Sequence, residues 1–144
     1  PDYKQGLACL TLRILSARWG MARCCRRRDT ERIKLTIWAV RRADLTHEQF
    51  ETYWREQHAP LIKSVTEFNR HIRRYVQCYA VPSDLPLGAS GEYDGIAELS
   101  FDNVASMTTA FNEPRYLEIV RPDELKFVDL EKCLSYVSEE LQVI

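Results

Sequence analysis

One histidine lies on an apolar stripe of a predicted helix, where an imidazole could transfer protons. Phe50, Trp54 and His58 recur every four residues and Leu61 follows three residues later, so a helix would place all four on one face. Such a face turns towards the protein interior, and a partly buried imidazole exchanges protons near neutral pH. We therefore predict that His58 is the catalytic acid–base residue. The alternative is a structural imidazole that caps carbonyls or forms a hydrogen bond in the core.

Two acidic residues share one face of a predicted strand. Asp94 and Glu98 are separated by four residues of strand rise, about 13 Å, which is too far for a close carboxylate pair. We predict that Asp94 is a catalytic residue that orients His58 or a substrate hydroxyl, with an arginine partner as the alternative. For Glu98, an interface ion pair with Arg73 or its neighbour is at least as reasonable as catalysis.

Tyrosine hydroxyls could donate hydrogen bonds to a phenolate or enolate that forms during proton transfer. We predict that Tyr53 is a catalytic residue of this kind, with packing of the ring and a hydroxyl at the rim as the alternative. Flat side chains would form the walls of a pocket for an aromatic ring. The predicted substrate-binding residues are Trp38, Trp54, Tyr75, Tyr79, His71 and Phe101.

The sequence lacks the motifs of several common cofactor and metal sites. No three of the singled-out His and acidic residues have a metal-ligand spacing, and the five cysteines form no Cys-x-x-Cys pair. A Gly-x-Ser-x-Gly motif, a glycine-rich phosphate loop and a dinucleotide fingerprint are all missing. We therefore expect no metal and no cofactor, and hydrolase, kinase and nicotinamide-dependent functions are excluded. Haem binding through a lone histidine is kept as a minor alternative.

The elements that must position these residues follow the order β-α-β, β-α-β. Strands are predicted at residues 33–40, 72–81, 93–101 and 133–138 from their β-branched, aromatic and alternating composition. Thr46 and Gln49 form a capping-box pattern that begins a helix over residues 46–58, and Pro60 bends or restarts it. Asp102 is predicted to cap the second helix. This order predicts an α+β, ferredoxin-like fold, in which four antiparallel strands carry both helices on one face.

The uncovered face of such a sheet needs a partner. We expect it to carry Trp38, Tyr75, Tyr79 and Ile96, an apolar patch that is unusual for a monomer. A second copy of the chain would cover it, giving a homodimer in the form of a dimeric α/β barrel. Two prolines and two glycines predict a long loop over residues 82–91, which would move over a site.

Charge divides the chain into two parts. The 144 residues carry a net charge of −1, but residues 1–31 hold seven basic and three acidic side chains, which leaves −5 for residues 32–144. We predict that residues 1–31 form a basic arm or extension and that residues 32–144 form the folded domain. An acidic body argues against nucleic-acid binding, which requires a sustained basic face. The predicted partners are a small aromatic substrate and a second copy.

The apolar stretches and the cysteines of the chain indicate its compartment and its relation to membranes. The apolar stretch at residues 7–15 is interrupted by Thr11 and Arg13 and is far shorter than the roughly 20 residues that cross a bilayer. We therefore expect no membrane partner. The odd number of cysteines, two of them adjacent, favours reduced thiols and a cytoplasmic location.

Three segments resemble one protein family. They are Tyr-Trp-Arg-Glu-Gln-His-Ala-Pro-Leu at residues 53–61, Tyr-Asp-Gly-Ile-Ala-Glu-Leu at residues 93–99 followed by Phe101, and Lys-Phe-Val-Asp-Leu-Glu at residues 126–131. Together they resemble the EthD-type branch of the dimeric α/β-barrel superfamily, in consistent order over residues 33 to 138. The His-Ala-Pro match adds support for a role of His58.

This resemblance implies a small, dimeric protein that requires no organic cofactor. Fungal members of the family resemble decarboxylases and dehydrating or cyclising enzymes of aromatic polyketides. The resemblance therefore implies a lyase, either a decarboxylase or a dehydratase, acting on an aromatic polyketide or a phenolic β-keto acid. A polyketide cyclase or isomerase is the first alternative, and a non-catalytic binding or accessory protein for an oxygenase is the second.

Overall fold

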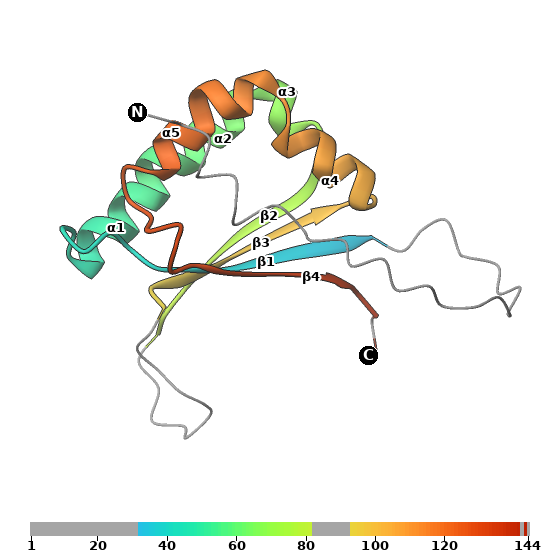
Figure 1. The fold of residues 1–144 in the computed structure, drawn as a ribbon. Helices are drawn as coiled ribbons and strands as arrows, with labels where there is room; N and C mark the ends of the chain where they lie inside the picture. The colour runs from blue at the N-terminus through green and yellow to red at the C-terminus, as the bar shows by residue number, and fades with distance from the viewer. Residues whose placement is uncertain (1–31, 82–92, 142, 144) are drawn as a thin grey trace, which may run out of the picture.

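The computed structural model describes residues 32–81, 93–141 and 143, and places one sheet beneath a layer of helices (Figure 1). The sheet is antiparallel with strand order β2-β3-β1-β4. Its strands are β1 (Ile33–Ala39), β2 (Ile72–Tyr79), β3 (Gly95–Phe101) and β4 (Leu134–Glu139). The predicted α+β fold with a four-stranded antiparallel sheet is thus confirmed. The predicted arm at residues 1–31 and the loop at residues 82–91 lie outside the described residues.

The first helical path is continuous but changes its hydrogen-bond pattern midway. It comprises α1 (His47–Tyr53), the π-helical turn η2 (Trp54–His58) and α2 (Ala59–Ser64), followed by the short α3 (Thr66–Asn69). Thr46 caps α1 in the predicted capping box with Gln49. Pro60 has no N–H to donate, and the turn before it is widened so that the Ala59 N–H reaches the Trp54 carbonyl.

The second half of the chain repeats this arrangement. Helix α4 (Val104–Phe111) is followed by the π-helical turn η3 (Tyr116–Val120) and by α5 (Arg121–Glu124). In η3 the Arg121 N–H reaches the Tyr116 carbonyl, and Pro122 follows directly. An aromatic residue six positions before a proline therefore begins each π turn. Both π turns lie in the helical layer and turn buried side chains inwards.

One predicted helix cap is wrong. Asn103, not Asp102, caps α4, through a reciprocal capping box with Ser106. Asp102 instead pairs with Arg73 on the neighbouring strand. The amide of Asn103 accepts from the N–H of Ser106 three residues later, which is the geometry a cap requires.

Strand register corrects the predicted composition of the open face. Tyr75 lies opposite Leu99 and Tyr79 opposite Gly95, and directly opposed residues point to the same face of a sheet. Leu99 is buried beneath the helices, so both tyrosines belong to the covered face. Trp38 lies opposite Ile96, and these two residues do lie on the open face as predicted. The open face also carries Leu134 and Tyr136 of β4.

The core lies between the sheet and the helices. Its largest fully buried side chains are Phe50, Phe68, Phe101, Tyr116, Val120 and Phe127. Trp54 packs directly on the sheet at Gly95, where a Cβ would approach the indole Cζ3 to 2.6 Å and the Cys78 carbonyl oxygen to 3.0 Å. The absence of a side chain at Gly95 therefore allows Trp54 to reach the sheet and form one wall of the site described next.

Candidate active site

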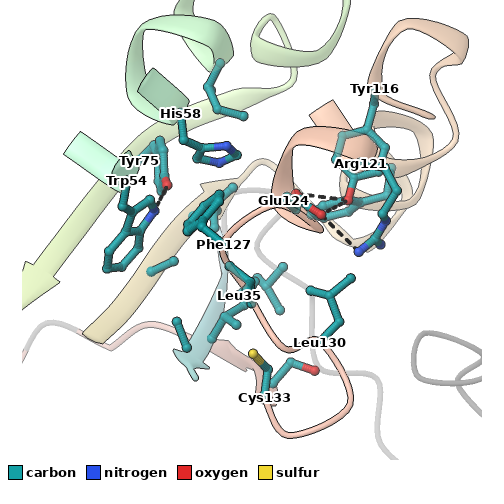
Figure 2. Close-up of a pocket in the computed structure, with 18 of the residues that line it drawn as sticks. Leu35, Trp54, His58, Tyr75, Tyr116, Arg121, Glu124, Phe127, Leu130 and Cys133 are labelled. Atoms are coloured by element: carbon teal, nitrogen blue, oxygen red, sulfur yellow. Dashed lines mark hydrogen bonds and ion pairs between the residues drawn. The ribbon is translucent and has the colours of Figure 1, made fainter. Parts of the chain in front are cut away.

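A cavity of about 140 Å³ opens between the sheet and the helical layer (Figure 2). Its walls are largely apolar, with Leu35, Ala97 and Leu99 from the sheet and Ile62 and Phe127 from the helical side. The polar groups on these walls include the side chains of His58, Tyr75, Tyr116, Arg121 and Glu124. An apolar cavity with a few convergent polar groups is the usual form of a small-molecule site.

His58 forms a buried pair with a carboxylate. Its side chain comes from the end of η2, and its Nδ1 lies 2.9 Å from Oδ2 of Asp123 on α5. The His58 residue is 5% exposed, and its ring packs against Phe127 with 5.0 Å between ring centroids. Burial lowers the pKa of His58 below its ordinary value near 6.5, although Asp123 opposes that shift. The imidazole is therefore neutral at pH 7 and able to accept a proton.

Asp123 is held as a carboxylate by three donors. The Tyr53 hydroxyl donates to Oδ1 at 2.6 Å, Lys126 Nζ donates to the same oxygen at 3.1 Å, and His58 lies against the other oxygen. Burial by itself would raise the pKa of Asp123, but the bonds from Tyr53, His58 and Lys126 outweigh burial and lower it. Burial and the contact with Asp123 raise the pKa of Tyr53, which stays protonated as a donor.

The second nitrogen of His58 faces the cavity. Nε2 has no hydrogen-bond partner among the described residues. Among those same residues, every side-chain nitrogen or oxygen that is fully buried does have a partner. Nε2 is therefore accessible, and the accessible space that His58 lines is the cavity. Because Asp123 is ionised, it accepts a hydrogen bond from the Nδ1–H of His58. In the neutral imidazole the lone pair is then on Nε2. The pair thus presents a base to whatever the cavity holds.

Tyr75 presents a hydrogen-bond donor to the same cavity. Its hydroxyl oxygen accepts from Trp54 Nε1 and from Gln77 Nε2, each at 3.1 Å, and donates to none of the residues that the structure describes. Burial raises the pKa of Tyr75 to about 12, so the hydroxyl keeps its proton. With both acceptor positions filled, the remaining O–H is free to donate to an oxygen of a bound molecule.

A second carboxyl group lines the cavity at Glu124. Arg121 Nη1 lies 2.9 Å from its Oε2, and the Tyr116 hydroxyl donates to its two oxygens at 3.3 and 3.2 Å. Despite Arg121, burial raises the pKa of Glu124 to about 7. Asp123 and Glu124 are thus adjacent carboxyl groups with opposite shifts of pKa.

The predicted catalytic residues are only partly brought together. His58 and Tyr53 share the Asp123 network, but Tyr53 does not line the cavity. Asp94 does not orient His58, since its carboxylate is bound by Arg41 and lies 2.9 Å from His47. This is the arginine pairing that was the alternative for Asp94. It arises because the Asp94 N–H bonds the Ala39 carbonyl, which places the carboxylate beside the residues that follow β1.

The predicted substrate-binding residues divide in the same way. Trp54 and Tyr75 line the cavity, and Tyr79 packs against Trp54 behind it. Phe101 is fully buried in the core. His71 does not line the cavity, and its Nε2 lies 2.9 Å from Oε1 of Glu113. Trp38 cannot form a wall with Trp54, because the two indoles lie on opposite faces of the sheet.

Sequence reasoning missed Asp123, Glu124, Tyr116 and Arg121. The sequence does contain a signal for them, because Trp54 lies six positions before Pro60 and Tyr116 lies six positions before Pro122. Aligning the two segments would have placed Arg121, Asp123 and Glu124 around the second proline, opposite the His-Ala-Pro segment. Within the described ranges, no three His, Cys, Asp or Glu side chains gather in a way that could hold a metal ion. Nor does any described helix have both the length and the apolar composition needed to cross a bilayer.

Solved structures share this architecture. An EthD family protein from Bacillus halodurans superposes with a TM-score of 0.58 at 20% identity, covering 76% of this chain and 99% of that one. A dimeric ferredoxin-like protein of unknown function from Thermobifida fusca superposes with a TM-score of 0.52 at 13% identity, covering 77% of this chain and 92% of that one. At these identities the likeness concerns the fold.

Similar sequences carry more specific names. The conidial pigment biosynthesis dehydratase EthD of Metarhizium robertsii is 28% identical over 120 aligned residues, covering 75% of this chain and 84% of that protein. The dehydratase aurZ of Gibberella zeae is 24% identical over 112 aligned residues, covering 72% of this chain and 73% of that protein. A family model described as the EthD domain matches residues 42–131, a stretch that includes His58, Asp123 and Glu124. Because this match spans more than half of the chain, the protein belongs to the EthD family.

Proposed function

We propose that this protein is a dehydratase that removes water from a β-hydroxy ketone carried on an aromatic ring, as in aromatic polyketides. The observation that carries the proposal is the His58–Asp123 pair, which presents a neutral imidazole nitrogen to an apolar cavity. Loss of water from such a ketone begins with removal of an acidic proton beside the carbonyl, which a positioned imidazole performs. The names of the two similar fungal proteins, both dehydratases, support the same reaction.

The cavity residues have distinct roles in this proposal. His58 Nε2 removes the α-proton, and Asp123 stabilises the imidazolium that forms. The electron pair of the broken C–H bond moves to the carbonyl oxygen, where the Tyr75 hydroxyl donates a hydrogen bond to the enolate. The enolate then re-forms the carbonyl as the C–O bond to the β-hydroxyl group breaks; that oxygen takes up one proton and leaves as water, and a carbon–carbon double bond forms. Every step is a proton transfer or an elimination, and none calls on a cofactor.

The volume of the cavity limits the part of the substrate that it encloses. Buried cavities of roughly 150 Å³ accept a ligand of the size of benzene, and this cavity measures about 140 Å³. A single ring therefore fits within the walls formed by Trp54, Phe127 and the sheet. A larger polycyclic substrate would place its reacting ring inside and the remainder in the mouth of the cavity.

Turnover of a simple β-hydroxy ketone tests the proposal. The β-hydroxy derivative of α-tetralone aromatises to α-naphthol when it loses water, so α-naphthol formation reports the reaction directly. We expect wild-type protein to form α-naphthol and His58→Ala to lower the rate by about 10²–10⁴-fold while retaining the same circular dichroism spectrum. Full turnover by folded His58→Ala would contradict the proposal.

The same assay separates the other reactions considered for this fold. A β-keto acid that loses the mass of carbon dioxide would identify a decarboxylase, and a product of unchanged mass would identify a cyclase or isomerase. Saturable binding of α-naphthol without conversion of any of these compounds would identify a carrier or accessory protein. Dehydration is preferred because both similar fungal proteins are named for it.

We also propose that the protein is a homodimer formed through the open face of its sheet. Tyr136 and Leu134 are 62% and 51% exposed on that face, and Trp38 and Ile96 lie beside them on β1 and β3. Contiguous apolar side chains of this kind are typical of protein interfaces. Two structural neighbours are described as dimeric proteins with a ferredoxin-like fold, which supports a two-fold pairing of sheets.

A further inference from the structure

We propose that Glu124 is the residue that donates a proton to the departing hydroxyl group, acting as the acid that complements the base His58. This inference rests on the proposed dehydration and assigns its second proton transfer. Hydroxide is a poor leaving group, so an elimination of water near neutral pH requires a proton donor at the oxygen that leaves. Among the described residues, Glu124 lines the cavity with a carboxyl group, whereas Asp123 lies behind His58 and does not line it.

The position of Glu124 suits this task. It follows Asp123 directly on α5, and neighbouring residues of a helix point about 100° apart, so their side chains diverge. The Asp123 carboxylate lies against His58. The Glu124 carboxyl lies with Tyr116 and Arg121 (Figure 2). His58 and Glu124 thus approach one cavity from η2 and α5, on two different helical segments.

The surroundings of Glu124 keep a proton available. Burial raises its pKa to about 7 even though Arg121 lies within 2.9 Å, because the carboxylate form is poorly solvated. The pKa of His58 is lowered, so there is a range of pH in which the imidazole is neutral while the Glu124 carboxyl is protonated. The ionisable or charged groups around Glu124 are Arg121 and Asp123 on α5, Tyr116 on η3, and Tyr75 on β2 across the cavity.

The two residues together balance the reaction. His58 takes the α-proton, and the C–H electron pair becomes the enolate. The enolate re-forms the carbonyl as the C–O bond to the β-hydroxyl breaks, and Glu124 transfers its proton to that oxygen, releasing water. His58 is then an imidazolium and Glu124 a carboxylate. Return of one proton from His58 to solvent and uptake of one by Glu124 restore the starting state, with no change in oxidation level.

A change of leaving group tests the role of Glu124. The probes are the β-hydroxy and β-fluoro derivatives of α-tetralone, which yield α-naphthol with loss of water and of fluoride, respectively. Fluoride leaves with little need for a proton, whereas hydroxide does not. We expect Glu124→Gln to slow the loss of water by about 10²–10⁴-fold and to change the loss of fluoride by less than about fivefold. His58→Ala should slow both reactions, because both begin with removal of the α-proton.

Control variants and pH profiles complete the test. Glu118→Gln removes an exposed carboxylate of η3 that pairs with Arg115, and we expect it to leave both rates unchanged. The wild-type rate of water loss should fall as the pH rises through about 7, and Glu124→Gln should lack this alkaline decline. Equal slowing of both substrates by Glu124→Gln, or no slowing of water loss, would overturn the inference. Failure of wild-type protein to convert either ketone would overturn the proposed dehydration itself.

Discussion

At the scale of single residues, three buried or partly buried carboxyl groups illustrate how surroundings set chemistry. Asp94 and Asp123 are both ionised, each held by several donors, but only Asp123 meets an imidazole. Glu124 also has Arg121 and the Tyr116 hydroxyl against it, but burial outweighs these donors and raises its pKa to about 7. The same functional group is therefore bound by an arginine at Asp94, paired with an imidazole at Asp123, and proposed to supply a proton at Glu124.

The Asp123 contact makes a prediction about pH dependence. Asp123 raises the pKa of His58 against the effect of burial, so Asp123→Asn should lower that pKa further. In the proposed mechanism, activity requires neutral His58 and is lost as pH falls through its pKa. The acid limb of kcat/KM should therefore move to lower pH in the variant. We also expect kcat to fall by about 10²–10⁴-fold, because the imidazolium loses its counter-charge. Steady-state rates from pH 4 to 9 with the β-hydroxy ketone, covering roughly the range in which carboxyl and imidazole groups titrate, measure both effects.

Asp129→Asn is the matched control. This carboxylate pairs with Lys132 at 2.6 Å and has no contact with His58. It removes the same charge from the same half of the chain, and the acid limb should not move. An acid limb that stays in place in Asp123→Asn would show that Asp123 does not tune the imidazole.

At the scale of elements, two π turns shape the helical layer. Each precedes a proline that cannot donate an N–H, and each positions residues of the cavity wall: Trp54 and His58 in η2, and Tyr116 in η3. A π turn widens the helix locally and changes the direction of the side chains that follow. His58 at the end of η2 thereby reaches Asp123 on α5, 65 residues along the chain.

The contact of η2 with the sheet depends on a glycine. A methyl group at Gly95 would lie 2.6 Å from the Trp54 indole, so Gly95→Ala should destabilise the protein by about 1–3 kcal/mol through overpacking. Urea unfolding followed by far-ultraviolet circular dichroism would measure the loss. In a Trp54→Phe background the smaller ring removes Cζ3, and the same alanine should cost less. An equal cost in both backgrounds would mean that Trp54 is not the obstacle.

At the scale of the whole molecule, the helices cover one face of the sheet and leave the other face uncovered (Figure 1). Tyr136→Glu should place a charge in the proposed interface, on the open face of the sheet, where burial against a second copy would desolvate it. We expect light scattering coupled to gel filtration to give a dimer mass for wild type and a monomer mass for the variant. Val104→Glu, at a 51% exposed site on α4, should remain a dimer. A monomeric wild type would contradict the interface.

Local pattern was sufficient for much of this protein. The order of strands and helices, the capping box at Thr46 and the inward direction of His58 all follow from spacings of two to four residues, and the structure agrees with them. Such spacings are read within one element, where side-chain direction is set by the helix or strand itself. Errors of one or two residues at the ends of strands come from the same source, since local pattern marks the ends of an element weakly.

Tertiary structure alone decided which residues meet. Asp123, rather than Asp94, became the partner of His58 because α5 packs beside η2, and no local periodicity records that contact. Tyr75 joined the cavity because the register of β2 against β3 turned it beneath the helices, and a shift of one residue would have turned it out. The amino-acid sequence by itself therefore determined the elements and a candidate base. The carboxylates, the hydroxyl donor and the cavity that make this base useful were determined by long-range packing.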